Sequence, residues 1–224
     1  MKKYLITVTA ILCVLCAVLS LSACQKVPAE QEESHISYMQ QAFYLGKTKD
    51  FTTRLVMGVS EAMFVADGKT TDVRSFATLT VVPQHVDLFN EAYDYTLKGD
   101  KGEISGALDK DSFGASYSAA ISDLAAIGTP VEVTVKSNKI EESIPLADML
   151  SESITGVKAL EIAEAQLTDK LTASDKEREI YVKYINDAES DASDYYWYVA
   201  FIASPTDYYA VLVAPDGKIV SVNP

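Results

Sequence analysis

An acidic stretch near the C-terminal end of the chain has the residue types of a metal-binding loop. Asp187, Glu189 and Asp191 alternate with small side chains, and Ca²⁺ prefers clustered carboxylate and carbonyl oxygens. An EF-hand loop would require a glycine where this chain has Ala192 and a closing glutamate where it has Tyr198. We therefore interpret the stretch as a solvated connection between strands, keep calcium as the alternative, and assign no metal site.

The residues of hydrolytic catalysis are sparse. His35 and His85 are the only histidines, and neither is accompanied by the Gly-x-Ser-x-Gly turn that presents a nucleophilic serine. Zinc sites draw on several His and Cys ligands, which this chain does not offer. Paired carboxylates could support glycoside hydrolysis in any chain this acidic. A hydrolase using acidic residues is thus the alternative, whereas we predict no enzyme activity, no catalytic residue and no cofactor.

Aromatic side chains are concentrated in the last quarter of the chain. The sequence holds 13 Tyr, 7 Phe and 1 Trp, and nine of these lie between Tyr181 and Tyr209. Side chains alternate between the two faces of a strand, so only one face of this aromatic strand can pack under a helix. The other face packs on a second domain or binds a partner or ligand. The predicted surface comprises Tyr195, Tyr196, Trp197, Tyr198, Tyr208 and Tyr209.

The N-terminal segment predicts how the protein is held in the cell. Lys2 and Lys3 precede an apolar run over residues 5–21, which is the layout of a secretory signal. Leu21-Ser22-Ala23-Cys24 resembles the lipobox of bacterial lipoproteins. The resemblance implies that residues 1–23 are removed and that Cys24 carries a lipid anchor, with a plain signal peptide or an uncleaved anchor as alternatives. Residues 24–34 are then a flexible membrane spacer.

Net charge limits the partners. The formal charge of −13 becomes −15 when Lys2 and Lys3 leave with the signal. Nucleic acids and anionic lipid surfaces attract basic proteins, so we exclude nucleic acid and electrostatic adhesion to lipid. Cys13 and Cys16 also lie in the signal, which leaves Cys24 alone and predicts no internal disulfide.

Residues 35–150 predict a strand-rich, β-sandwich-like domain that begins with a short helix. The apolar residues Ile36, Met39, Phe43 and Tyr44 fall near helical spacing before Gly46. Turn residues and β-branched runs follow. We expect strands over residues 51–60, 62–66, 73–82, 93–97, 103–108, 131–135 and 139–144, with a hairpin turn at residues 67–68 and an inserted helix over residues 116–127.

Residues 151–224 predict a small α+β domain in which a helix covers an antiparallel sheet. Apolar residues recur at steps of three and four from Val157 to Leu171, which indicates an amphipathic helix. Strands are expected over residues 179–185, 195–203, 208–213 and 218–222. The predicted fold class of the whole chain is therefore α+β.

Two segments of this last region resemble a known domain. The helix start from Ile154 to Ala163 and the closing turn from Val213 to Val220, which contains Asp216-Gly217-Lys218, look like a PepSY domain. The resemblance implies a module of exported bacterial proteins that restrains peptidases or otherwise binds at the cell envelope, and it carries no catalytic residues. We therefore predict an extracytoplasmic lipoprotein, tethered to a bacterial membrane through Cys24, that binds or regulates an envelope protein or peptide.

Overall fold

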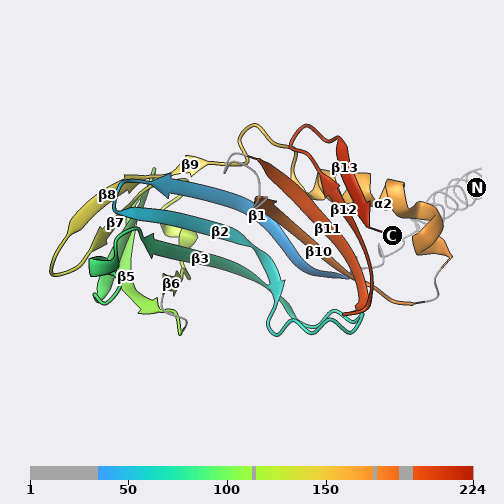
Figure 1. Ribbon diagram of the computed structural model, residues 1–224, viewed down its shortest axis with the longest axis horizontal. Coiled ribbons are helices and arrows are strands. Elements are labelled where there is room, and N and C mark those ends of the chain that lie inside the picture. The colour runs from blue at the N-terminus through green and yellow to red at the C-terminus, as the bar shows by residue number, and fades with distance from the viewer. Residues whose placement is uncertain (1–34, 113–114, 174–175, 187–193, 224) are drawn as a thin grey trace, which may run out of the picture. The chain divides into compact units, whose positions relative to one another are not determined.

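A mixed sheet of thirteen strands dominates the computed structural model, which describes residues 35–112, 115–173, 176–186 and 194–223 (Figure 1). One α-helix and two 3₁₀ turns complete the described part of the chain. The first nine strands are β1 (Ile36–Lys47), β2 (Phe51–Glu61), β3 (Val73–Pro83), β4 (Tyr93–Gly99), β5 (Glu103–Lys110), β6 (Tyr117–Ala120), β7 (Pro130–Lys136), β8 (Glu141–Pro145) and β9 (Ala147–Asp148). The others are β10 (Glu179–Asn186), β11 (Tyr195–Ser204), β12 (Asp207–Val213) and β13 (Ile219–Asn223); the helix is α2 (Gly156–Thr172), and the turns are η1 (Val86–Leu88) and η2 (Leu124–Ala126).

The N-terminal and C-terminal strands belong to one sheet, which corrects the predicted α+β fold class. The strand order is β13-β12-β11-β10-β1-β2-β3-β6-β5-β4-β7-β8, and β9 pairs with β1. The junction is the parallel pairing of β1 with β10, in which Tyr38 is opposite Tyr181 and Met39 is opposite Val182. The protein is therefore mostly β. The segment expected to form a separate helix-on-sheet domain instead extends the sheet begun by the N-terminal strands.

The predicted N-terminal helix is wrong, because β1 occupies its place. A β-bulge between Gln40 and Ala42 interrupts the pairing with β2, and a bulge breaks the period of two that identifies a strand. The apolar residues then fall three and four apart, as they would in a helix. Gln40 is buried at this irregularity, where its Oε1 accepts the Tyr184 N–H at 3.2 Å.

Two further predicted elements are also wrong. The expected helix over residues 116–127 is β6 followed by η2, since β6 pairs with both β3 and β5 and pairing outweighs the helical propensity of its alanines. Residues 62–66 belong to the loop between β2 and β3. The turn at Asp67 and Gly68 is confirmed, and Gly68 has the positive φ of 84° that glycine adopts readily.

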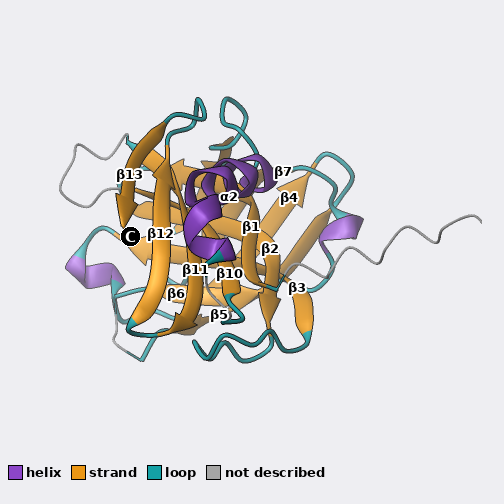
Figure 2. Cartoon of the chain, turned by 90° about the vertical axis from the view of Figure 1, so that its right-hand side faces the viewer, coloured by secondary structure: helices purple, strands orange, loops and turns teal. Residues whose placement is uncertain are grey.

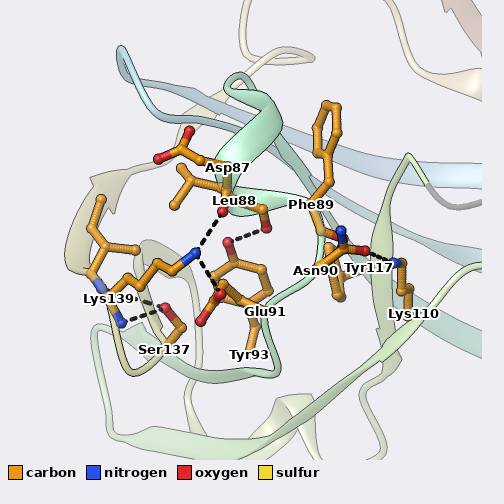
Figure 3. Close-up of polar contacts among 11 residues, drawn as sticks. Asp87, Leu88, Phe89, Asn90, Glu91, Tyr93, Lys110, Tyr117, Ser137 and Lys139 are labelled. Atoms are coloured by element: carbon orange, nitrogen blue, oxygen red, sulfur yellow. Dashed lines mark hydrogen bonds and ion pairs between the residues drawn. The ribbon is translucent and has the colours of Figure 1, made fainter.

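The first core is formed by strands β1 to β8, each of which contributes at least one buried apolar side chain. Phe51, Leu55 and Leu79 are among its fully buried members. The connection that carries η1 is fixed onto this core, as Figure 3 shows: the Tyr93 hydroxyl donates to the Leu88 carbonyl at 2.7 Å, and the Tyr117 hydroxyl donates to the Phe89 carbonyl at 2.6 Å. Among charged groups, Lys139 Nζ donates to the Asp87 carbonyl and pairs with Glu91, both at 2.9 Å. Three of these four contacts hold backbone carbonyls in place and the fourth is an ion pair between side chains, so we interpret the cluster as structural.

The second core lies under α2, which crosses the C-terminal strands (Figure 2). The Thr155 side chain caps the helix by accepting the Lys158 N–H, a contact that satisfies one free donor of the first turn. Ala159, Ala163 and Leu167 are buried against β10, β11 and β12. The helix and the four C-terminal strands are thus confirmed as elements, although not as a separate sheet.

Candidate functional site

The two faces of β11 have different environments. Tyr195, Trp197, Val199 and Phe201 belong to the core under α2, as their alternation along the strand predicts. Trp197 is fully buried, and its Nε1–H donates to Ser153 Oγ and to the Ile154 carbonyl, both at 3.0 Å. Tyr196, Tyr198 and Ile202 point to the opposite face and are partly exposed. The helix therefore leaves this second aromatic face uncovered.

A run of aromatic rings crosses the sheet on that uncovered face. The ring centroids of Tyr198 and Tyr181 are 6.4 Å apart, Tyr181 stacks on Tyr38 at 4.6 Å, and Tyr38 approaches Phe76 at 5.3 Å. Phe64 leans on Tyr181 from the side, with its centroid 5.7 Å away. We call these five residues, from β11, β10, β1, β3 and the β2–β3 loop, the aromatic patch.

Gly58 allows β1 and β2 to approach closely beside the β-bulge of β1. This glycine is opposite Phe76 in β3 and Gln40 in β1. Its strand, β2, lies between the two strands that carry Phe76 and Tyr38. A Cβ atom at position 58 would lie 2.1 Å from the Met39 carbonyl oxygen. A side chain is excluded at this point, because the backbone of β1 lies where the Cβ atom would be.

Two buried carboxylates hold the β2–β3 loop against the sheet. Glu179, at the start of β10, is fully buried, and its Oε1 accepts the Asp67 N–H at 2.8 Å and the Gly68 N–H at 2.7 Å. Glu61, at the end of β2, accepts the Thr71 hydroxyl at 3.0 Å. Hydrogen bonds to an ionised acceptor are stronger than neutral ones. The loop that carries Phe64 is therefore held against the sheet at Asp67 and Gly68 and again at Thr71.

The tyrosines of the patch stay protonated at neutral pH. Burial raises the pKa of the Tyr38 hydroxyl to about 12, and the neighbouring Tyr181 adds to this shift. Burial also raises the pKa of Tyr181 and of Tyr198. The patch is thus an uncharged surface with apolar ring faces and hydroxyl groups that can donate and accept hydrogen bonds, a combination that is favoured where proteins meet their partners.

The structure divides the six aromatic residues predicted as a surface between the two faces. Tyr195 and Trp197 lie under α2, and Tyr209 also packs against that core. Tyr196, Tyr198 and the exposed Tyr208 lie away from it. The sequence interpretation missed Tyr38, Phe64, Phe76 and Tyr181 as members of the patch. Tyr38 meets Tyr181 through the pairing of β1 with β10, and Phe76 and Phe64 join them from β3 and the β2–β3 loop, so residues far apart in the sequence come together without a local signal.

Tyr209 belongs to a charged hollow of about 470 Å³ beside the end of α2. The Arg178 guanidinium lies 4.4 Å from the centre of its ring, and Arg178 Nη2 pairs with Asp207 Oδ1 at 2.9 Å. Hydrogen bonds from Lys176 and then Arg178 lower the pKa of the Asp207 carboxyl. The hollow is lined by the two acids Asp169 and Asp207 and the three bases Lys170, Lys176 and Arg178, which leaves one positive charge. The pair of Arg178 with Asp207 ties the start of β10 to β12, so we interpret the cluster as structural.

Other predicted features fall outside the part of the chain that the structure describes. These are the lipidation site Cys24 and the alternative calcium ligands Asp187, Glu189 and Asp191. Within residues 35–223, apart from the gaps given above, three or more metal-ligating side chains do not cluster anywhere. The described residues likewise form no helix of the length and hydrophobicity needed to cross a bilayer.

Comparison with known proteins gives no relative. No family model matches the chain, and no significant match was found among curated proteins or solved structures. The functional argument therefore depends on the residues and geometry of this chain.

Proposed function

We propose that the protein is a membrane-tethered, extracytoplasmic lipoprotein that acts as a non-enzymatic binding or regulatory module, with the aromatic patch as its contact surface for an envelope protein or peptide. The observation that carries this proposal is the run of four rings across the uncovered face, from Tyr198 through Tyr181 and Tyr38 to Phe76. Tyrosine-rich surfaces bury large apolar area at low entropic cost and keep polar tips for hydrogen bonds.

Rigidity of the patch supports a binding role. Its strands are paired on both sides, and Glu179 fixes the loop that carries Phe64. A pre-organised surface loses little conformational entropy on binding. The lipobox and the PepSY-like segments, which point to the cell envelope and to peptidase restraint, remain predictions that agree with such a role.

The alternative, a hydrolase that uses acidic residues, needs a carboxyl of raised pKa in an enclosed cleft. Partial burial and the neighbouring Glu161 raise the pKa of Glu164, but this residue lies on the exposed side of α2. The buried carboxylates Glu61 and Glu179 are engaged in holding the β2–β3 loop. These positions favour the binding role over the hydrolase.

Photo-crosslinking in native membranes tests the proposal. A photoreactive phenylalanine at position 198 should give discrete protein or peptide adducts with the full-length chain. The same residue at position 86 is the matched control, since Val86 is 80% exposed and lies outside the patch. Replacing Tyr181 with Ser, in the chain carrying the crosslinker at 198, should reduce adduct yield. Equal labelling from positions 198 and 86, or none from either, would refute the patch as a contact surface.

A further inference from the structure

Exposed apolar side chains gather at one end of the sheet. Five of the ten large hydrophobic residues that are exposed in the described chain lie there: Met63, Phe64, Val65, Val73 and Tyr208. The pairing of the strands places them together. β2 ends where β3 begins, β10 runs parallel to β1, and Tyr208 is opposite Ile202, which is itself opposite Glu179 at the start of β10. Figure 1 shows the β2–β3 loop and the β11–β12 turn at this same end.

The tip of the β2–β3 loop is held in its exposed position. Met63 is 74% exposed and Val65 is 53% exposed, yet the residues that follow are fixed by Glu179 through the Asp67 and Gly68 amides. The Ala62 N–H donates to the Asp72 carbonyl at 3.0 Å and closes the base of the loop. Hydrogen bonds thus hold the loop in a position that exposes the three consecutive apolar residues Met63, Phe64 and Val65. Exposed apolar patches of this kind mark interaction sites.

The chain enters the sheet at this end. β1 begins at Ile36, and Tyr38 is opposite Ser60, two residues before the loop. Ten residues separate Cys24 from His35, and a segment of that length spans at most about 40 Å when fully extended. A lipid on Cys24 would therefore hold the start of β1, and with it the loop end, within about 40 Å of the bilayer, whereas the η1 end lies beyond the far end of β3.

The exposed charges of residues 62–74 balance, while the carboxylates of Glu61 and Glu179 that hold the loop are buried. Asp67 and Asp72 are balanced by Lys69 and Arg74, and Arg74 lies 3.8 Å from Asp72. The chain as a whole carries −13, which opposes attraction to anionic headgroups. Whatever binds this surface therefore binds it through apolar contacts rather than through charge. It has to accommodate Met, Phe, Val and Tyr side chains together.

We infer that the loop tip formed by Met63, Phe64 and Val65, with Tyr208 beside it, inserts into the interfacial layer of the bilayer that holds Cys24. Apolar side chains bury in this layer while tyrosine sits at the headgroup level. The inference rests on the lipid tether of the proposed function. It adds an orientation: the tether and the loop form two attachments, so that the aromatic patch faces sideways, close to the membrane surface, towards a membrane-bound partner.

Lipid-quenching measurements test this orientation. The lipidated full-length chain, with Met63→Cys carrying an environment-sensitive dye, is reconstituted into phosphatidylcholine vesicles that contain nitroxide-labelled lipid. We expect a blue shift and loss of emission at position 63. A dye at Val86→Cys, at the opposite end of β3, should show neither. Equal emission from the two positions on floated vesicles would overturn the docking while leaving the tether intact.

A second variant separates docking from folding. With the dye moved to Lys69→Cys, the double substitution M63S/V65S should abolish quenching, whereas V86S should leave it unchanged. Because all three replaced side chains are more than half exposed, the fold should persist and can be checked by circular dichroism. Retained quenching in M63S/V65S would overturn the inference. Failure of the wild-type chain to float with vesicles would instead refute the lipid tether, and the docking with it.

Discussion

Replacing Glu179 tests the physical basis of the anchored loop. Its carboxylate accepts two backbone N–H groups at 2.8 and 2.7 Å and is fully buried. Each hydrogen bond to a charged group contributes about 1.5 to 3 kcal/mol. The Gly68 amide is buried, while the Asp67 amide is only partly so, and water can replace the second bond. Two such bonds together contribute about 3 to 6 kcal/mol, and we therefore expect Glu179→Ala to destabilise the protein by about 3 kcal/mol, the lower end of that sum.

Glu179→Gln is the informative companion. The amide oxygen can keep both accepted hydrogen bonds, but its NH₂ group would occupy the position of Oε2, which has no hydrogen-bond partner among the described residues. An unsatisfied buried donor costs about 1 to 3 kcal/mol, partly offset because a buried charge is removed. We expect a loss of about 1 kcal/mol for Gln.

Urea-induced unfolding of the three proteins, followed by Trp197 fluorescence, measures these differences. Amide hydrogen exchange at Gly68 gives a local readout, and it should accelerate strongly in the Ala variant and slightly in the Gln variant. Equal stability losses for Ala and Gln would show that charge, rather than the acceptor oxygen, holds the loop. A loss below about 1 kcal/mol for Ala, less than one ordinary hydrogen bond, would refute the anchoring role altogether.

Three further predictions concern the patch and the first core. Gly58→Ala should lower the free energy of unfolding by about 3 kcal/mol or more, since the alanine Cβ would lie 2.1 Å from the Met39 carbonyl oxygen and overpacking of this kind distorts the backbone. Thermal unfolding measures this loss, and an unchanged stability would contradict the close approach of β1 to Gly58. Tyr198→Ala should weaken partner binding by about 30-fold, the size of a hot-spot loss, in a titration of the captured partner, whereas Val86→Ala should change nothing. Burial raises the pKa of Tyr93 from 10.0 to about 12, so the folded state holds the hydroxyl proton more tightly than the unfolded state. The contribution of the protonated Tyr93 to the free energy of unfolding is therefore complete below pH 10 and is lost as the pH rises towards 12. Guanidinium unfolding between pH 9 and 12 should therefore show a steeper loss in wild type than in Tyr93→Phe, and identical slopes would refute this assignment.

Local periodicity predicts the elements whose pattern is uninterrupted. The helix α2 repeats its apolar residues at steps of three and four, and β11 alternates without a break until Ile202. In β1 the bulge at Gln40–Ala42 shifts the alternation by one residue, which makes a long central strand look like a helix. Local sequence therefore misassigned the one strand on which the architecture depends.

The aromatic patch could be predicted only in part for the same reason. Alternation along β11 places Tyr198 on the face away from α2, and that much follows from the sequence. Its neighbours Tyr38 and Tyr181 meet because β1 and β10 are parallel, and parallel partners are joined through long connections that leave no local signal. The close approach at Gly58 depends instead on the β1–β2 register at the bulge, and a glycine within a strand has several explanations when only the sequence is known.

The parallel β1–β10 pair also couples the two cores of the protein. β1 contributes Tyr44 to the first core and Phe43 to the second, so neither core is complete without this strand. Glu179 extends the coupling, because it belongs to the C-terminal segment but fixes the loop between β2 and β3. Loss of the C-terminal strands would therefore release Phe64 and uncover Tyr38 as well as remove Tyr181 and Tyr198. A partner lost on deletion of residues 151–224 would consequently not locate recognition in that segment, whereas single substitutions in the patch, made in the full chain, can do so.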